Sequence, residues 1–290
     1  MPATPPTKRK ITFPLTLDTA SQTASPIDCE AAYLEMGEGV PLLMLHSFFA
    51  EASGFLPLME RLSTRFRCIG LDMLGFGESS KPEIRYSVTA EVQFVAEFID
   101  RLDLAPCYIL GHSFGGWVGT AYTLQFPDRI SGLILAAPAG IRDDSLRDRN
   151  TPLQFLLNPT PLVDWGLSAA TPIAGVLGQR EELEKIKWFR QQLMTQPAGR
   201  SFIAGRLNGI KGAETVDTQI HQIVQPTLVV AGELDTTVPF HHCQTYADKI
   251  PNAQLVVIPD ADHSLPQKYA PQMAEAIDRF LGGYSGLQKH

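Results

Sequence analysis

The chain has few cysteines, and their spacing excludes two common classes of small protein. The four cysteines stand at positions 29, 68, 107 and 243, without any C-x-x-C pair. This scatter indicates neither a zinc site nor a disulfide framework, and we expect no metal and no cofactor. Cys68 and Cys107 fall inside predicted strands, which is typical of small buried hydrophobes in a reducing compartment.

A long apolar run is also absent, so no integral membrane segment is predicted. The basic N-terminus is followed by a short apolar stretch from Ile11 to Leu17, which Pro14 interrupts. That stretch is too short and too broken for the core of a signal peptide. We therefore expect a cytoplasmic protein.

Basic residues are fewer than acidic residues, and no basic stripe with interleaved aromatic residues occurs. The chain has 31 acidic and 24 basic residues, a net charge of −7. This excludes a nucleic-acid footprint, so the expected partner is a small molecule. Apolar residues make up 44% of the 290 residues, enough for a sizeable core, and the oligomeric state stays open.

Short, nearly continuous apolar runs dominate the rest of the chain. Continuous rather than alternating hydrophobicity indicates strands buried on both faces, as in a parallel sheet. The expected strands are Pro41 to His46, Arg67 to Asp72, Cys107 to Gly111, Ile130 to Ala136, Pro226 to Ala231 and Ala253 to Ile258. Residues 1–26 look flexible, with a possible strand at Ile11 to Leu17 that could pair with Ala31 to Glu35.

Helical patterns fill most gaps between these strands, which predicts an α/β fold: a mostly parallel, doubly wound sheet of about eight strands. The expected helices are Phe55 to Thr64, Thr89 to Leu102, Ser113 to Phe126, His241 to Lys249 and Pro271 to Leu281. One long stretch, residues 140–225, lacks a convincing buried strand. We interpret it as a helical cap inserted into a core made of residues 27–139 and 226–290.

The motif Gly111-His112-Ser113-Phe114-Gly115 lies between a predicted strand and a predicted helix. A sharp turn there lifts the serine hydroxyl off the end of the sheet, and the flanking glycines remove Cβ atoms that would collide with the backbone. The chemistry indicated is nucleophilic attack by Ser113.

A serine nucleophile needs a base, and the base needs an orienting carboxylate. Asp235 follows the apolar run ending at Ala231, and His263 follows the run ending at Ile258. In a parallel sheet these strands deliver Ser113, Asp235 and His263 to the same carboxyl-end edge.

That order, the elbow and the loop His46-Ser47-Phe48-Phe49 together resemble the α/β-hydrolase family, in its serine-nucleophile members with a helical cap. The resemblance runs from about Glu30 to Leu281. Two further segments match the family pattern, Asp72-Met-Leu-Gly-Phe-Gly-Glu-Ser79 and Phe126-Pro-Asp-Arg-Ile-Ser-Gly-Leu-Ile-Leu135. The family uses aspartate as nucleophile in haloalkane dehalogenases and soluble epoxide hydrolases, so Ser113 argues against both.

The resemblance implies that Ser113 is the nucleophile, His263 the general base and then acid, and Asp235 the residue that fixes the imidazole tautomer. It also implies an oxyanion hole formed by the backbone N–H groups of Phe48 and Phe114. The family usually has glycine where this chain has Ser47, so the serine hydroxyl could itself contact the substrate oxygen.

Other residues near these positions are alternatives. Asp143 is the reserve for the acid, and Asp260 and Asp262 lie close to His263 in sequence. His46 is interpreted as a structural brace of the loop, and His112 as an elbow side chain that could face the substrate. The remaining histidines suit a solvated surface: His221, His241 and His242.

The leading functional hypothesis is a serine esterase that cleaves a carboxylic ester with a hydrophobic acyl or alcohol group. Phe49 and Trp165, with Ser47 and His112, are the candidate substrate contacts, although core packing explains apolar residues such as Trp165 and Phe155 equally well. The same residues could support hydrolysis of a C–C bond, a thioester or an amide, or cofactor-free perhydrolysis. A hydrolase-like ligand receptor with little turnover is the alternative of another class.

Overall fold

An eight-stranded sheet forms the centre of the protein in a computed structural model that describes residues 5–19, 22–23, 25–142, 155–207 and 214–283. The strands lie in the order β1-β4-β6-β5-β7-β8-β9-β10, and all pairs from β6 to β10 are parallel. Their bounds are β1 Thr7–Leu15, β4 Ile27–Met36, β5 Val40–Leu45, β6 Phe66–Leu71, β7 Cys107–His112, β8 Ile130–Ala136, β9 Thr227–Gly232 and β10 Ala253–Ile258. The predicted doubly wound, mostly parallel sheet is therefore confirmed.

The N-terminal segment corrects one expectation. The possible strand at Ile11 to Leu17 is present as the edge strand β1, which runs antiparallel to β4 with Ile11 opposite Ala31. It begins earlier than expected, at Thr7 opposite Glu35, so residues 7–10 are part of a strand and not of a flexible segment. Alternation explains the strand, because Phe13 and Leu15 are buried while Thr12 and Pro14 point to solvent. A short hairpin of β2 Asp18–Thr19 and β3 Gln22–Thr23 follows.

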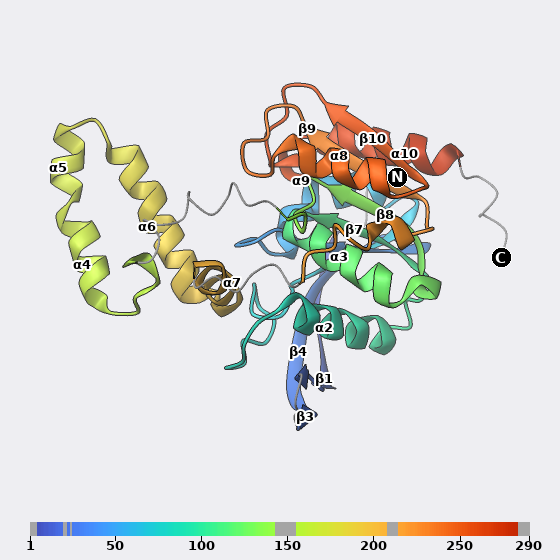
Figure 1. The fold of residues 1–290 in the computed structure, drawn as a ribbon, viewed down its shortest axis with the longest axis horizontal. Helices are drawn as coiled ribbons and strands as arrows, with labels where there is room; N and C mark the ends of the chain where they lie inside the picture. The colour runs from blue at the N-terminus through green and yellow to red at the C-terminus, as the bar shows by residue number, and fades with distance from the viewer. Residues whose placement is uncertain (1–4, 20–21, 24, 143–154, 208–213, 284–290) are drawn as a thin grey trace.

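Helices cover both faces of the sheet (Figure 1). The face formed with α1 Leu56–Leu62, α9 Leu265–Lys268 and α10 Ala270–Gly283 encloses one apolar core, and the face with α2 Val88–Arg101, α3 Phe114–Gln125 and α8 Phe240–Lys249 encloses the other. Side chains alternate between these cores along the central strands. In β5, for example, Leu43 and Leu45 enter one core while Leu42 and Met44 enter the other.

The chain between β8 and β9 carries the insertion, and its described parts form helices and no strand. These helices are α4 Pro161–Ala169, α5 Thr171–Val176, α6 Arg180–Thr195 and α7 Pro197–Leu207, followed by a 3₁₀ turn at Ile220–Gln222. Figure 1 shows α4, α5 and α6 standing away from the sheet, with α7 between them and the core. We call α4, α5 and α6 the helical arm.

The insertion does not interrupt the sheet, because β8 and β9 are hydrogen-bonded neighbours with Leu133 opposite Thr227. The carboxyl ends of the strands from β5 to β10 therefore share one edge, with the loops after β5, β7, β9 and β10 beside one another. Within the part of the chain that the structure describes, no helix is long and apolar enough to cross a bilayer.

Candidate active site

Ser113 occupies the turn from β7 into α3 in a strained backbone conformation. Its φ of 54° and ψ of −110° lie in a region that residues with a Cβ rarely adopt. Hydrogen bonds hold the turn in place: the Ser113 N–H donates to the Ala136 carbonyl at 2.9 Å, and the Ala139 N–H donates to the Ser113 carbonyl at 3.0 Å. The residue is buried, and β8 fixes where it sits.

The glycines of the motif are required by close backbone approach. A Cβ on Gly111 would lie 2.4 Å from the Gly115 carbonyl oxygen, and a Cβ on Gly115 would lie 2.0 Å from the Leu45 carbonyl oxygen. Such distances are well inside van der Waals contact, so neither position accepts a side chain without movement of backbone. The elbow geometry thus follows directly from the Gly-x-Ser-x-Gly spacing.

Asp235 and His263 come together from the loops after β9 and β10. The Asp235 Oδ2 atom lies 2.7 Å from the His263 Nδ1 atom, and the Asp235 side chain is only 4% exposed. The second oxygen, Oδ1, accepts the N–H groups of Thr237 at 2.8 Å and Val238 at 3.0 Å. A carboxylate so placed fixes the imidazole with its proton on Nδ1, which leaves Nε2 free to accept a proton.

The electrostatics of Asp235 favour its ionised form. Burial alone would raise the pKa of this carboxyl, but the hydrogen bond and charge of His263 and the N–H groups of Val238 and Thr237 outweigh it. The net result is a pKa below the ordinary value, so Asp235 is a carboxylate at neutral pH.

His112 connects the elbow to the His263 loop. Its Nε2–H donates to the His263 carbonyl at 2.8 Å, and the two imidazole rings lie 4.8 Å apart between centroids. Burial, followed by the repulsion of His263, lowers the pKa of His112 to about 3, so the ring is neutral. We predicted a substrate contact for His112; the structure shows its contact with the His263 loop, and the substrate contact stays a prediction.

The loop after β5 is anchored by His46, as expected for a structural brace. The His46 Nε2 atom accepts the Met73 N–H at 3.0 Å, so Nδ1 carries the proton and donates to the Ser47 carbonyl at 2.8 Å. The His46 carbonyl accepts the Gly115 N–H at 3.0 Å, which connects this loop to the elbow. Burial lowers the pKa of His46, consistent with a neutral ring that accepts one hydrogen bond.

Phe48 and Phe114, the two expected oxyanion donors, lie side by side. Their rings are stacked with centroids 4.1 Å apart, and the next residue, Phe49, has a φ of 56°. The structure therefore brings the loop after β5 against the first residue of α3. This is the place where two backbone N–H groups could bind one oxygen.

Three further phenylalanines surround this pair, and we did not predict them. The ring centroid of Phe202 in α7 lies 5.5 Å from that of Phe48 and 4.9 Å from that of Phe114. The centroids of Phe189 in α6 and Phe49 are 5.3 Å apart. Phe76 lies 6.0 Å, between centroids, from both Phe48 and Phe114. We call these six side chains the phenylalanine cluster: Phe48, Phe49, Phe76, Phe114, Phe189 and Phe202. A signal existed for Phe76, which lies inside the Asp72 to Ser79 turn, whereas nothing in the sequence shows which way α6 and α7 run.

Other predicted positions lie elsewhere. Trp165 is on α4 in the helical arm with 69% of its surface exposed, because α4 stands away from the sheet, so the structure does not bring it to Ser113. Phe155 is also exposed. Asp143 lies outside the described residues.

The alternative acids and bases have other surroundings. Asp262 binds the Ser264 N–H and the Lys268 ammonium, and Asp260 is exposed, with its backbone carbonyl accepting the Tyr269 hydroxyl. His221 and His241 are exposed as expected, but His242 is buried, because it lies on the side of α8 that packs against the protein beside Cys243 and Tyr246.

Comparison with known proteins places this geometry in a family. The family profile described as alpha/beta hydrolase fold matches residues 40–266. The 2-hydroxymuconate semialdehyde hydrolase of Pseudomonas putida is 29% identical over 265 residues, which cover 87% of this chain and 91% of that protein. The 2-hydroxy-6-oxo-6-(2'-aminophenyl)hexa-2,4-dienoic acid hydrolase of Metapseudomonas resinovorans is 26% identical, with 87% of each chain covered.

Among solved structures, a thermophilic esterase from Thermogutta terrifontis is similar, with a TM-score of 0.70 and 25% identity over 94% of this chain and 98% of that one. The profile covers most of the chain and includes the elbow, Asp235 and His263. With these matches and the sheet order above, the chain belongs to the α/β-hydrolase fold family and is a hydrolase.

Proposed function

We propose that this hydrolase cleaves a carboxylic ester through an acyl-Ser113 intermediate, with His263 as base and Asp235 as the orienting acid. The observation that carries the proposal is the 2.7 Å contact between Asp235 and His263, on a loop that His112 holds beside the elbow. A base oriented by a buried carboxylate next to a strained serine is the arrangement that activates a hydroxyl.

In the proposed reaction the Ser113 hydroxyl oxygen attacks the ester carbonyl while its proton passes to the His263 Nε2 atom. The tetrahedral intermediate then expels the alcohol, which takes that proton. Water attacks the acyl-serine in the same way, so the carboxylic acid is released and the hydroxyl of Ser113 is restored. Asp235 stabilises the imidazolium that forms in each half and is not itself protonated.

For the oxyanion we propose the backbone N–H groups of Phe48 and Phe114. Support comes from the stacking of these residues and from the Gly115 N–H to His46 carbonyl bond, which connects their two segments. Preorganised donors of this kind are worth about 10² to 10³ in rate each. The Ser47 hydroxyl is our alternative to the second N–H donor.

The proposed substrate is a small, uncharged ester with an apolar acyl or alcohol group. The phenylalanine cluster provides apolar surface next to the elbow. Within the part of the chain that the structure describes, Arg190 is the only buried lysine or arginine, and it is committed to Asp164 and to backbone carbonyls. A buried substrate carboxylate would need a free cation, which Arg190 does not provide.

The insertion at residues 140–225 is proposed to act as the cap over a core of residues 27–139 and 226–290. Contacts of α7 with the site support this role: Phe202 packs on Phe114, and a Cβ on Gly199 would lie 2.4 Å from the Phe49 ring. Segments of the insertion thus lie against the oxyanion loop, where they would contact a bound acyl group.

The test of the proposal is Ser113→Ala assayed with p-nitrophenyl esters of increasing acyl length. We expect a loss of about 10⁴-fold or more in kcat, because the nucleophile is removed while binding groups remain. Intact-protein mass after treatment of wild type with a serine-directed phosphonate should show one adduct, absent in the variant. Retention of full ester hydrolysis by Ser113→Ala would overturn the proposal.

A second candidate is hydrolysis of a C–C bond in a vinylogous dicarbonyl compound. The names of the relatives from Pseudomonas putida and Metapseudomonas resinovorans favour it, since the second names a hexadienoic acid hydrolase. Assaying wild type with a 2-hydroxy-6-oxohexadienoic acid beside the esters separates the two. A kcat/KM for the dienoic acid exceeding that for the best ester would favour this candidate.

A further inference from the structure

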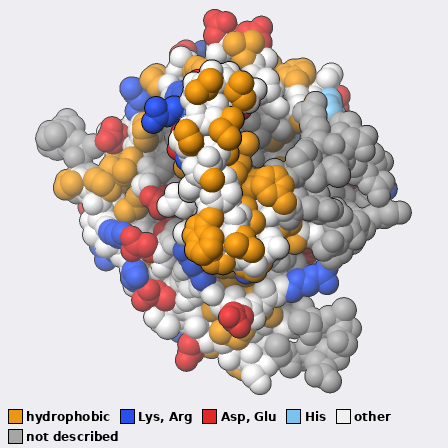
Figure 2. Space-filling model, turned by 90° about the vertical axis from the view of Figure 1, so that its left-hand side faces the viewer, with side chains coloured by type: hydrophobic (Ala, Val, Ile, Leu, Met, Phe, Trp, Pro, Cys, Tyr) orange, Lys and Arg blue, Asp and Glu red, His pale blue; other side chains and the backbone are white. Residues whose placement is uncertain are grey.

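The helical arm exposes an apolar surface that is unusually large for its size. Seven large hydrophobic side chains on it are between 39% and 88% exposed: Leu162, Trp165, Ile173, Val176, Leu177, Ile186 and Trp188. Figure 2 shows hydrophobic side chains gathered along the side of the molecule where the arm stands. We call these seven residues the arm patch.

The arm has too little buried surface of its own to stand alone. Neither α4 nor α5 has a buried side chain, and α6 buries only Leu183, Arg190 and Leu193. Isolated helices shorter than about 12 to 15 residues are marginal in water, and helices in proteins owe most of their stability to packing of an apolar face. A face that remains uncovered in one copy of the chain therefore calls for a partner.

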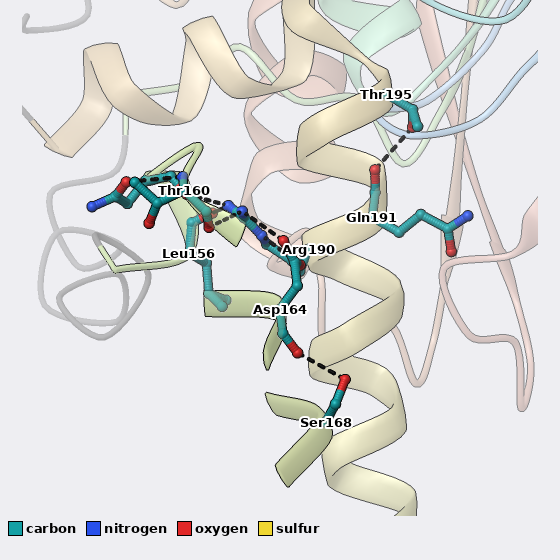
Figure 3. Close-up of polar contacts among 8 residues, drawn as sticks. Leu156, Thr160, Asp164, Ser168, Arg190, Gln191 and Thr195 are labelled. Carbon is teal, nitrogen blue, oxygen red and sulfur yellow. Dashed lines mark hydrogen bonds and ion pairs between the residues drawn. The ribbon is translucent and has the colours of Figure 1, made fainter. Parts of the chain in front are cut away.

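The arm is nevertheless held in one shape by a buried cation. Arg190 on α6 is 2% exposed and donates to the carbonyls of Leu156 and Asn158 at 2.6 Å each. It also binds both carboxylate oxygens of Asp164 on α4, at 3.1 and 3.2 Å (Figure 3). Such a multidentate guanidinium fixes the spacing of α4 and α6, so the patch is a preformed surface.

The charge of the patch identifies the partner. Residues 161–178, which include α4 and α5, contain one charged side chain, Asp164, and Arg190 neutralises it. On α6, Lys185 and Lys187 flank Ile186 and Trp188, and these lysines are paired with Glu182 and Glu184. Two copies of this surface can meet without like-charge repulsion, although the whole chain carries −7. An anionic membrane would require unpaired lysines or arginines on the patch; residues 161–178 contain neither, and Lys185 and Lys187 on α6 are paired with glutamates.

The area of the patch also fits a dimer. Seven large side chains with these exposures present several hundred Å² of apolar surface, on the scale of the roughly 800 Å² per partner in a standard interface. We propose that a second copy of this chain covers the arm patch, so that the protein is a homodimer joined arm to arm. A two-fold axis through the interface would place the same patch on both sides.

The experiment is sedimentation equilibrium of the full chain from about 1 to 100 μM, with wild type, Val176→Glu and the control Val224→Glu. Val176 is 88% exposed on the patch, and Val224 is 64% exposed outside the arm, so both substitutions place a charge on the surface of the monomer. In a two-fold interface one substitution buries two like charges. We expect a dimer for wild type and the control, and a dissociation constant raised at least about 100-fold by Val176→Glu.

Three outcomes would overturn the proposal. Wild type could be a monomer throughout the range, or a dimer that Val176→Glu leaves intact, which would place the interface elsewhere. A monomer that sediments with phosphatidylcholine vesicles through the patch would identify lipid as the partner. Far-UV circular dichroism of both variants serves as the control that they are folded. Added salt should leave the wild-type dissociation constant unchanged or lower it, because the interface is apolar.

Discussion

Gly115 is the residue that joins the elbow to the loop after β5. Its N–H donates to the His46 carbonyl, and a Cβ here would lie 2.0 Å from the Leu45 carbonyl oxygen. We expect Gly115→Ala to lower the free energy of unfolding by roughly 1 to 3 kcal/mol, as overpacking does, and to lower kcat at least about 100-fold because the loop moves. Chemical denaturation and ester kinetics measure the two effects.

The matched control is Gly175→Ala in α5, where a Cβ meets nothing within 4 Å. This substitution should leave kcat unchanged and raise helix stability by a fraction of a kcal/mol, because alanine is the better helix former. Equal activity of the two variants would show that the elbow tolerates a side chain and that the contact is relieved by backbone movement.

Asp235 provides a second prediction at this scale. Asp235→Asn should lower kcat by on the order of 10³ to 10⁴, because an amide cannot hold the His263 tautomer as a carboxylate does. Asp262→Asn, a change on the neighbouring loop, should have an effect of less than about threefold, since that carboxylate pairs with Lys268. Asp143→Asn tests the reserve acid, and a larger loss there than at Asp235 would reassign the role.

Single residues also show how far the sequence can lead. That Ser113, Asp235 and His263 lie at one edge of the sheet was predictable, because each follows an apolar strand and strand ends share an edge in a parallel sheet. The contact of His112 with the His263 carbonyl could not be predicted from the sequence. These residues are 151 positions apart and meet through tertiary packing, which no local pattern encodes.

Among the elements, α4 and α6 form a unit whose integrity depends on Arg190. Replacing Arg190 by methionine removes the bonds to Asp164 and to three carbonyls, those of Leu156, Asn158 and Thr160. Loss of several charge-assisted bonds should accelerate amide hydrogen exchange in α4 by at least about tenfold. Exchange measured by mass spectrometry on peptides covering residues 156–169 checks this.

Arg279→Met is the control at this scale, because Arg279 makes an exposed ion pair with Glu275 on α10. Such a pair contributes about 0 to 1 kcal/mol, so exchange in α4 should match wild type. If Arg190→Met also left exchange in α4 unchanged, the helix would be held by something other than the guanidinium.

The strands from β5 to β10 and the helices of the core were predictable within a few residues because their hydrophobic periods are strong. Edge strand β1 was harder: its N-terminal half is exposed and basic, from Lys8 to Lys10, so only its apolar end stood out. The path of the helical arm could not be predicted, since helices that bury so little carry no pattern that specifies a neighbour.

At the scale of the whole molecule, the buried neutral His112 makes stability depend on pH. Its pKa is about 3 in the folded protein and about 6.5 in an unfolded chain, so below pH 6.5 only the unfolded state gains the proton. The stability associated with His112 is thus complete above pH 6.5 and is lost as pH falls towards 3, by at most about 1.4 kcal/mol per pH unit.

His112→Gln keeps a side-chain N–H donor but does not titrate. Its stability relative to wild type should therefore rise steadily from pH 6.5 to pH 4, as measured by urea unfolding. Glu91 is fully buried and its pKa is raised, so its effect on the free energy of unfolding has the opposite pH dependence. Because Glu91 is present in both proteins, the difference between variant and wild type removes its contribution. A stability difference that stays constant with pH would show that His112 is charged in the native protein.

The hydrogen bond between Gly140 and Val216 has a consequence for how such a protein can change. The Val216 N–H donates to the Gly140 carbonyl at 3.0 Å, so the chain leaves for the helices of the insertion and returns from them at adjacent points. An insertion with touching ends can be lengthened, shortened or exchanged without altering the register of any strand. Residues of the insertion can therefore change while Ser113, Asp235 and His263 keep their places at the edge of the sheet.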